Sequence, residues 1–328
     1  MQAPNYYAAP GFDRAALRRR DSEWLRNAAA DPRSLFVPVW RSQNLVIEID
    51  GAGPRATLLT GAAAAAIHES AVDERLSRGE LVLLGLVEDR AHFALDVSAL
   101  EAPLEMLRSP ALEAAGIEAA PGGIDVRFAD LRQLGGRLER HEGALLALAR
   151  AMLFWHSRHR FCGVCGAPTR SKEAGYMRRC TDPACKAMHF PRTDPAVIML
   201  VTDGDRALLG RNKNFPVAAM YSTLAGFVEP GEALEDAVAR EVLEETAIRV
   251  AAVQYHSSQP WPFPANIMLG FYAEAATTAI SLDDGELADA RWFERDWLLS
   301  HEDDDTFRMP RRDSIARRLI EDWLHGRV

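Results

Sequence analysis

Residues 226–248 read GFVEPGEALEDAVAREVLEETAI, and this stretch carries the strongest signal in the chain. If residues 233–246 form a helix, Glu241, Glu244 and Glu245 stand at positions i, i+3 and i+4, so all three project from one side. Carboxylates this close repel one another unless a cation or a proton compensates them. Grouped oxygen ligands suit Mg²⁺ or Mn²⁺, and such ions most often serve enzymes that act on phosphate groups. An acidic, solvated helix is the alternative.

The apolar side of the same helix favours the metal site. Leu234, Val238 and Val242 form its apolar stripe, and a rotation of about 100° per residue places Glu241 and Glu245 beside that stripe. Carboxylates directed toward a core need a compensating charge. We therefore expect this helix to hold its carboxylates against a packed domain.

Composition and charge limit the class of protein. The chain has 328 residues, of which 48% are hydrophobic, and this is enough for two or three domains with packed cores. The longest apolar run, residues 81–87, is too short to span a membrane, and residues 1–10 lack the regions of a signal peptide. We therefore expect a soluble, cytoplasmic protein with no membrane partner. The net charge of −9 argues against a protein that coats nucleic acid.

The middle of the chain is basic despite that net charge. Such a run is either a solvated face or a surface that attracts a polyanionic substrate. The basic residues are His156, Arg158, His159, Arg160, Arg170, Lys172, Arg178, Arg179, Lys186 and Arg192.

All four cysteines of the chain lie within this basic region, at Cys162, Cys165, Cys180 and Cys185. Two short knuckles separated by a loop have the spacing of a four-thiolate zinc site. Two disulfides are the alternative, which the expected intracellular location disfavours. Because four thiolates fill a tetrahedral shell, we expect one structural zinc ion per chain. Zinc ribbons often bind nucleic acid or protein partners, and this role stays open.

The order of the predicted elements divides the chain into three domains. Residues 1–140 are expected to form an accessory α+β domain, residues 141–192 a linker helix and the zinc ribbon, and residues 193–328 the domain that carries the acidic helix. Nothing in the first domain has catalytic spacing, so an accessory or dimerising role is its simplest interpretation. Its expected helices cover residues 13–31 and 62–66, and its expected strands cover residues 35–40, 44–49, 81–87 and 91–95.

The third domain is expected to be an α/β/α sandwich with a mixed sheet, because strands surround the acidic helix. A helix at residues 143–159 precedes the cysteines. The strands expected after them cover residues 196–201, 206–209, 221–225, 252–255, 267–273 and 290–293, and a last helix covers residues 314–324.

An aromatic segment follows the acidic helix, reading SQPWPFP at residues 258–264. Prolines restrict the backbone and lower the cost of ordering a loop that presents rings, and rigid rings can stack on planar bases. The alternative is a surface turn whose Trp261 and Phe263 pack into a core.

Residues 226–248 resemble the Nudix box, whose pattern is G-x5-E-x7-R-E-U-x-E-E-x-G-U with U an aliphatic residue. Gly226, Glu232, Arg240 and the three glutamates match it. Ala247 departs from it, because the family has a glycine there that commonly leaves a helix in the left-handed conformation. An alanine in that conformation costs roughly 1 kcal/mol, unless the end of the helix is reshaped. Neither outcome removes a metal ligand.

The Nudix box, the preceding zinc ribbon and the SQPWPFP segment together resemble the NADH pyrophosphatase subfamily of Nudix hydrolases. The resemblance extends from Phe154 to the C-terminus. It implies metal-dependent hydrolysis of the pyrophosphate of NADH, and more weakly of NAD⁺, to reduced nicotinamide mononucleotide and AMP. Bacterial members can also remove NAD caps from RNA, and family members are commonly homodimers.

The resemblance also implies roles for individual residues. Arg240 and Glu232 would form an ion pair that braces the loop at Gly226 against the helix. The ligands of Mg²⁺ or Mn²⁺ would be Glu241, Glu244, Glu245, Glu286 and the carbonyl of Ala225. Substrate contacts would come from Phe190, Phe227, Gln259, Pro260, Trp261, Pro262, Phe263, Pro264, Ala265, Asn266 and Ala316. Phe190 stands where the subfamily often has a tyrosine and Asn266 where it has a serine, and these departures could change the preference among dinucleotides.

The expected reaction is hydrolysis by a metal-activated water, with one carboxylate accepting its proton. Glu245 is our candidate for this base and Glu244 is the rival. A non-catalytic Nudix-fold sensor of a dinucleotide is a different class of function, and Ala247 is the only feature that supports it.

Overall fold

The computed structural model describes residues 4–8, 12–67, 71–114, 124–215, 217–282 and 285–327. These residues form two compact units. The N-terminal unit comprises the described residues of Tyr7–Arg192 and Pro262–Ala265, and the C-terminal unit those of Met1–Tyr6, Thr193–Trp261 and Asn266–Val328. The N-terminal unit therefore contains most of the first predicted domain and all of the second. No helix within the described ranges is long and apolar enough to cross a membrane.

A sheet of order β3-β2-β1-β6-β5 organises the N-terminal unit, with β4 paired to β1 and β7 paired to β2. Of the strand pairs in this sheet that the structure describes, β1 and β6 are parallel and the others are antiparallel. The strands are β1 (Leu35–Trp40), β2 (Gln43–Ile49), β3 (Gly53–Ala56), β4 (Leu59–Thr60), β5 (Leu81–Val87), β6 (Arg90–Asp96) and β7 (Ile124–Ala129). The helices before α6 are η1 (Ala16–Arg18), α1 (Ser22–Ala30), α2 (Gly61–Ile67), α3 (Val72–Arg78), α4 (Pro103–Ala114), α5 (Leu131–Leu134) and η2 (Gly135–Arg137).

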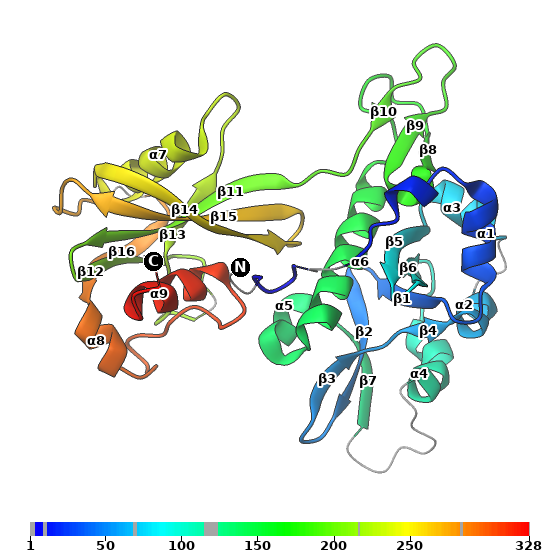
Figure 1. The fold of residues 1–328 in the computed structure, drawn as a ribbon, viewed down its shortest axis with the longest axis horizontal. Helices are drawn as coiled ribbons and strands as arrows, with labels where there is room; N and C mark the ends of the chain where they lie inside the picture. The colour runs from blue at the N-terminus through cyan, green and yellow to red at the C-terminus, as the bar shows by residue number, and fades with distance from the viewer. Residues whose placement is uncertain are drawn as a thin grey trace. The chain divides into compact units, whose positions relative to one another are not determined.

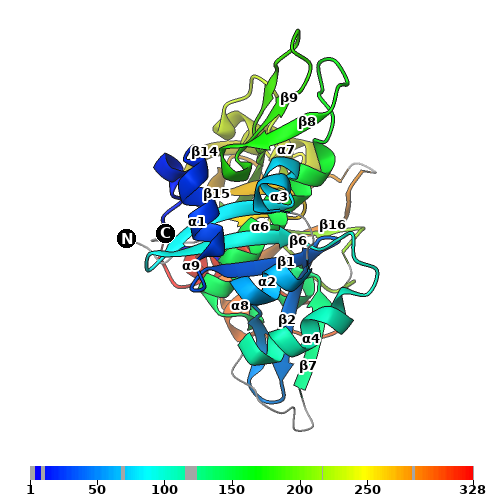
Figure 2. The ribbon, with the colours of Figure 1, turned by 90° about the vertical axis from the view of Figure 1, so that its right-hand side faces the viewer.

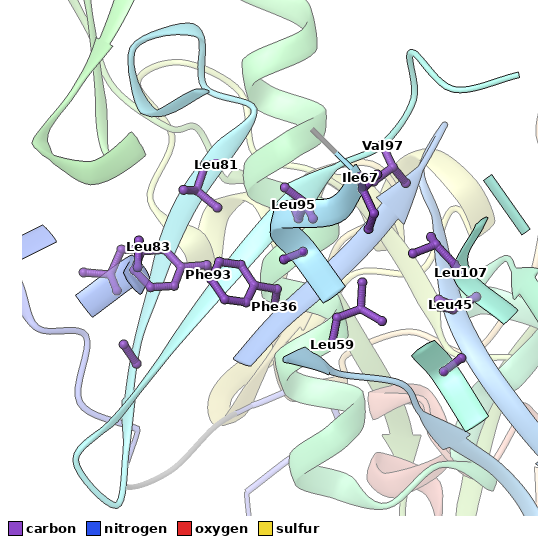
Figure 3. Packing of buried hydrophobic residues seen from close by; sticks show 14 of the residues in the cluster. Phe36, Leu45, Leu59, Ile67, Leu81, Leu83, Phe93, Leu95, Val97 and Leu107 are labelled. Atoms are coloured by element: carbon purple, nitrogen blue, oxygen red, sulfur yellow. The ribbon is translucent and has the colours of Figure 1, made fainter. Parts of the chain in front are cut away.

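The core of this unit lies where β1, β5 and β6 meet the helices (Figure 3). The rings of Phe36 and Phe93 stack with centroids 5.3 Å apart. Leu83 and Leu95 are fully buried beside them. The apolar run of β5 thus forms a strand buried on both faces, as expected for a continuous apolar run bounded by polar residues.

The helix α6 (Arg140–Arg158) joins the sheet to the zinc ribbon. It packs against β1, β5 and β6 along its length. The ribbon has the antiparallel strands β8 (Thr169–Lys172), β9 (Met177–Cys180) and β10 (Met188–His189), with the short helix η3 (Glu173–Gly175) between β8 and β9. The strand β8 lies beside α3 (Figure 2). Contacts of this kind explain why the ribbon and the first domain form one unit.

One predicted helix is shorter than expected. The sequence predicts a helix over residues 13–31, but α1 begins at Ser22, and only η1 precedes it. The carboxylate of Asp21 accepts a hydrogen bond of 2.9 Å from the backbone N–H of Trp24. An aspartate in that position caps a helix N-terminus, and this signal outweighs the helical periodicity before it.

The C-terminal unit is built on a mixed sheet of order β14-β15-β11-β12-β16, with β13 paired to β11. β11 and β15 pair in parallel, and the other neighbours are antiparallel. The strands are β11 (Asp194–Asp203), β12 (Arg206–Asn212), β13 (Leu224–Phe227), β14 (Val250–Trp261), β15 (Asn266–Ala275) and β16 (Leu287–Glu294), and the helices are α7 (Leu234–Thr246), α8 (Arg295–Ser300) and α9 (Ile315–Leu324).

Helices cover both faces of this sheet, which confirms the predicted α/β/α sandwich (Figure 1). α7 buries Ala237, Val238 and Val242 against one face. Each buried valine contributes about 1.5 kcal/mol to folding. α9 covers the opposite face with Leu319 and Ile320, which are fully buried. The acidic helix is therefore fixed by its apolar stripe, as its sequence predicts.

Candidate active site and zinc centre

The acidic helix α7 meets the sheet at Gly226, which pairs with Val197 in the β11–β13 ladder. The carboxyl group of Glu241 lies directly over Gly226, where a side chain would find no room. Ala225 precedes it in the same strand, opposite Ile198. The strand thus presents the backbone of residues 225 and 226 to the helix that carries the glutamates.

Arg240 ties this helix to the loop that precedes it. Its Nε donates a hydrogen bond of 2.6 Å to Glu232 Oε1, and its Nη2 donates one of 3.0 Å to Glu232 Oε2. Nη2 also donates to the carbonyl of Phe227 at 2.9 Å. The paired hydrogen bonds from Arg240 lower the pKa of Glu232 to about 2. A planar guanidinium suits this two-point contact, which holds the loop at one position relative to the helix.

The same guanidinium contacts two of the predicted metal ligands. Nη1 of Arg240 donates to Glu241 Oε1 at 2.9 Å and to Glu244 Oε2 at 3.0 Å. The Glu241 side chain is mostly buried, whereas that of Glu244 is 60% exposed. Burial is the main cause that raises the pKa of Glu241 above its usual value. Arg240 therefore compensates part of the negative charge on one side of the helix.

The carboxyl group of Glu245 has an oxygen atom that nothing in the described residues pairs. Its Oε2 is buried and has no hydrogen-bond partner there. Burial raises the pKa of Glu245 to about 8, and the neighbouring charges of Glu241, Glu286 and Glu244 add to the effect. An orphaned buried carboxylate oxygen among acidic neighbours has the chemistry of a cation ligand. The residues of this cluster fit a divalent metal ion.

Glu286 comes from a different part of the chain, directly before β16, and its side chain is exposed. Its charge acts on both Glu241 and Glu245, so the fold brings it near the helix. Within the described residues, the only metal-ligating group whose atoms lie within 4.8 Å of one another is formed by the four cysteines. The carboxylates are not grouped this closely, and Glu241 and Glu244 each direct one oxygen to Arg240.

The four cysteines meet at the tip of the ribbon as free thiols. The sulfur atoms of Cys162 and Cys185 are 3.8 Å apart, and those of Cys165 and Cys180 are 3.4 Å apart. Zn–S bonds of about 2.3 Å in a tetrahedron place sulfur atoms roughly 3.8 Å apart. The geometry fits a structural zinc ion, and the disulfide alternative finds no support.

Tight turns shape this thiolate group. Gly166 N donates to Cys162 O at 2.9 Å, and Val164 N donates to Cys162 Sγ at 3.4 Å. Backbone N–H groups at Cys165 and Val164 lower the pKa of Cys162 to about 6. His189 Nε2 lies 3.3 Å from the same sulfur, and the spacing of the cysteines does not predict this contact. Its only signal is a position four residues after Cys185.

Two of the predicted substrate residues have structural roles in the C-terminal unit. Gln259 is fully buried, and its amide nitrogen donates to the carbonyls of Asp313, at 2.7 Å, and Tyr6, at 3.2 Å. Its Oε1 accepts from Ile315 N at 2.8 Å. Ala316 is 4% exposed within the α9 core. A substrate contact by either residue stays a prediction.

The aromatic segment is divided between a strand and a turn. Residues 258–261 belong to β14, and Trp261 is half-buried. The turn Pro262–Ala265 belongs to the N-terminal unit, where the guanidinium groups of Arg132 and Arg150 each lie 4.9 Å from the ring centroid of Phe263. Phe263 is thus packed, as the alternative interpretation expected. Pro264 and the half-buried Pro260, Ala265 and Asn266 complete the segment.

The two other aromatic residues that we expected to contact substrate are exposed. Phe227, at the end of β13, is 58% exposed, and Phe190, directly after β10, is 57% exposed. Large exposed rings are available for stacking on a ligand. Phe190 belongs to the N-terminal unit and Phe227 to the C-terminal unit.

Three family models match successive parts of this chain. The model of the NADH pyrophosphatase-like rudimentary NUDIX domain matches residues 33–155, that of the NADH pyrophosphatase zinc ribbon domain matches residues 157–190, and that of the NUDIX domain matches residues 192–316. The fold and these matches define a Nudix hydrolase that carries a zinc ribbon.

A relative that aligns over most of its length shows the subfamily to which this chain belongs. NAD-capped RNA hydrolase NudC of Mycobacterium bovis (strain BCG / Pasteur 1173P2) is 40% identical over 254 residues, which cover 74% of this chain and 75% of that protein. The chain belongs to the NADH pyrophosphatase subfamily of Nudix hydrolases.

Other similar proteins share only part of their length with this chain. NAD-capped RNA hydrolase NUDT12 of Macaca fascicularis is 45% identical over 199 residues, or 57% of this chain and 43% of that protein. The chain thus spans less than half of NUDT12. A solved NUDIX hydrolase from Nitrosomonas europaea has a TM-score of 0.39 and 23% identity, covering 51% of this chain and 93% of that one.

Proposed function

We propose that this protein hydrolyses the pyrophosphate bond of NADH, and more weakly that of NAD⁺, giving reduced nicotinamide mononucleotide and AMP. The observation that carries the proposal is the buried Oε2 of Glu245, which has no hydrogen-bond partner among the described residues and lies near the charges of Glu241, Glu244 and Glu286. A cluster of this kind is costly to fold unless a ligand cation compensates it. The subfamily membership supports the choice of a dinucleotide.

In the proposed reaction, a water oxygen forms a bond to one phosphorus atom while the bond from that phosphorus to the bridging oxygen breaks. Glu245 accepts the proton of the attacking water, and its buried, unpaired Oε2 among the described residues is the atom proposed to take it. Glu244 is the rival base, but its side chain is exposed to solvent, whereas Oε2 of Glu245 is buried. Arg240 holds the helix and the loop in fixed positions relative to one another through its two hydrogen bonds to Glu232.

The proposed metal ligands are Glu241, Glu244, Glu245, Glu286 and the carbonyl oxygen of Ala225. A bound Mg²⁺ or Mn²⁺ would neutralise charge on the phosphates and make the attacking water more acidic. Oxygen ligands alone suit either ion, which agrees with the donor set of this cluster. The exposed rings of Phe190 and Phe227 stay proposed substrate contacts, since an exposed ring can stack on a base.

Product analysis tests the proposal. Purified protein is incubated with NADH, NAD⁺ or ADP-ribose, each with Mg²⁺, with Mn²⁺ or with neither metal, and the products are separated by chromatography. The expected result is metal-dependent release of AMP and reduced nicotinamide mononucleotide, fastest from NADH. Tight binding of a dinucleotide with no cleavage of any of the three would favour the sensor function instead.

Removal of NAD caps from RNA by the same centre is the second candidate function. The relatives named as NAD-capped RNA hydrolases favour it, and so does the basic region around the zinc ribbon. Turnover of free NAD⁺ and of NAD-capped RNA at matched concentrations separates the two functions. A higher kcat/KM on the capped RNA would make the RNA the preferred substrate.

The proposal extends to the assembly and location of the protein. We propose a homodimer, since subfamily members commonly form one, and light scattering of the purified chain measures its mass directly. We also propose a cytoplasmic location, which is supported by four free cysteines that suit a reducing compartment.

A further inference from the structure

A basic cavity lies in the N-terminal unit, apart from the residues assigned to catalysis. Its volume is about 360 Å³, and it is lined by the end of α3, the end of α6 and the first strand of the zinc ribbon. Four guanidinium groups line it, from Arg78, Arg160, Arg170 and Arg178, against the carboxylates of Glu80 and Asp96. The lining therefore has an excess of positive charge.

Arg178 forms the floor of this cavity and is only 3% exposed. Its Nε donates to Thr169 Oγ1 at 2.8 Å, and its Nη2 donates to Thr169 O at 3.1 Å. Nη1 donates to Arg78 O at 3.0 Å and to His156 Nδ1 at 2.8 Å. All these acceptors are neutral, and no ion pair to Arg178 occurs among the described residues. A buried guanidinium whose hydrogen-bond acceptors are all neutral favours the binding of an anion beside it.

The cavity is built around this guanidinium. His156 Nε2 lies 2.9 Å from Gly175 O and must donate to it, so the ring is neutral when Nδ1 accepts from Arg178. A Cβ at Gly79 would lie 2.2 Å from His156 Nδ1 and 2.8 Å from Arg178 Nη1. Gly79, whose φ is +81°, therefore gives the two side chains the space they occupy.

The rim of the cavity has the chemistry of a nucleotide contact. Arg160 and Arg170 are exposed there, and neither forms an ion pair within the described part of the chain. Arg78 differs, because it pairs with Glu74 and lies 3.9 Å from Glu80. Phe161 also lines the cavity, and 66% of its surface is exposed. Guanidinium groups bind phosphate oxygens, and an exposed ring stacks on a base.

We propose that this cavity binds the phosphate group of a nucleotide, with Arg160, Arg170 and Arg178 as its donors and Phe161 stacking on the attached base. The nucleotide is either a free mononucleotide or a unit of a single-stranded RNA. The RNA source rests on the proposed function, since it would make the cavity a holding site for the chain behind an NAD cap. The free nucleotide source would make it a site for a product such as AMP.

Binding measurements on the full chain test this site, with Mg²⁺ and Mn²⁺ omitted so that no substrate is consumed. The probes are AMP, a short single-stranded RNA with a 5′-phosphate, and inorganic phosphate. The variants are Arg160→Gln and Arg170→Gln at the rim, and Arg158→Gln is the matched control. Arg158 is exposed in the last turn of α6 and does not line the cavity, so its variant removes the same charge from the same region.

Each rim variant should weaken the probe that occupies the cavity by about tenfold, because a charge-assisted contact is lost, while Arg158→Gln should not. If RNA is that probe, the slope of log K against log salt should also fall by about 0.7 for each lost phosphate contact. Equal weakening by all three variants would reduce the site to a diffuse basic surface and overturn the proposal. Unchanged binding of all three probes in both rim variants would overturn it as well.

Phe161→Leu tests the base contact separately. It should weaken the nucleotide probe but not inorganic phosphate, and equal binding of the nucleotide by this variant would contradict stacking. Zinc content is measured for every variant to show that the ribbon is intact. Failure of the wild-type protein to cleave NADH would remove the proposed function without affecting these metal-free measurements, so the two proposals fail independently.

Discussion

Gly226 and Glu241 are in such close contact that a Cβ on the glycine would lie 1.9 Å from the carboxyl carbon of the glutamate. The backbone of Gly226 lies in an ordinary strand, so its conformation does not require a glycine. The position of the Glu241 side chain, a predicted metal ligand, requires it instead. The first residue of the motif thus contacts the first of its three clustered glutamates, although the two residues are fifteen positions apart in the sequence.

Replacing Gly226 by alanine should displace Glu241 while the fold persists, because the atoms in the way belong to the end of a flexible side chain. We expect metal affinity, measured from the Mg²⁺ or Mn²⁺ dependence of turnover, to fall by about 10- to 100-fold. Gly163→Ala is the control, because no atom lies within 4 Å of its added Cβ. An unchanged metal dependence in Gly226→Ala would show that the position of Glu241 does not matter.

Ala247 ends α7 in the left-handed conformation, with φ 59° and ψ 11°, and its N–H donates to Leu243 O at 2.8 Å. The first of the two expected outcomes is thus the correct one, and the helix end is not reshaped. Ala247→Gly should raise the free energy of unfolding by about 1 kcal/mol, measured by urea denaturation. Ala237→Gly, in the helix interior, should lower it. A destabilised Ala247→Gly would mean that the alanine is not strained.

His156 makes stability depend on pH. Burial, followed by the charge of Arg178, lowers the pKa of His156 from 6.5 to about 3. Between these values the unfolded chain binds a proton that the folded protein does not, so this contribution to stability is lost as pH falls below 6.5. By pH 4 the loss should be on the order of 3 kcal/mol. Urea denaturation at several pH values measures it.

The comparison for this pH effect is His156→Gln, which keeps a donor for Gly175 O but cannot be protonated. The variant should lose less stability than the wild type between pH 6.5 and pH 4, and acid-sensitive carboxylates contribute equally to both. Parallel curves for the two proteins would rule out His156 as the source of the pH dependence.

The zinc centre predicts one zinc ion per chain, measured by elemental analysis. Cys165→Ser removes an exposed thiolate with little change in packing, so zinc should be lost without a separate packing effect. Because structural zinc contributes about 10–16 kcal/mol of binding free energy in small zinc domains, the ribbon should then unfold and become sensitive to protease. One zinc ion retained per chain in this variant would contradict a four-thiolate site.

Much of the fold could be predicted from local patterns. The apolar stripe of α7 and the apolar run of β5 gave correct elements because burial on one or both faces imposes the pattern directly. The start of α1 was wrong because a single capping side chain at Asp21 decides it. The strand β14 is longer than predicted, because pairing with β15 extends it through the proline-containing segment.

The site could be predicted only in part, for a related reason. The Arg240–Glu232 pair and the carboxylates of α7 are close in sequence, so a helix suffices to bring them together. The burial of Gln259 depends on Tyr6 and Asp313, which are distant in the chain and have no sequence signal that links them. The basic cavity likewise combines α3, α6 and β8, whose proximity only the folded unit reveals.

The proposed role of Glu245 is tested directly by the turnover of NADH by the wild-type protein and by Glu245→Gln, both at saturating Mg²⁺ or Mn²⁺. Glu244→Gln is measured beside them, and thermal unfolding shows that the fold is retained. We expect the wild type to release AMP and Glu245→Gln to lower kcat by about 10²- to 10⁴-fold, the contribution of a general base. Near-full activity of Glu245→Gln, or an inactive wild type, would contradict this expectation.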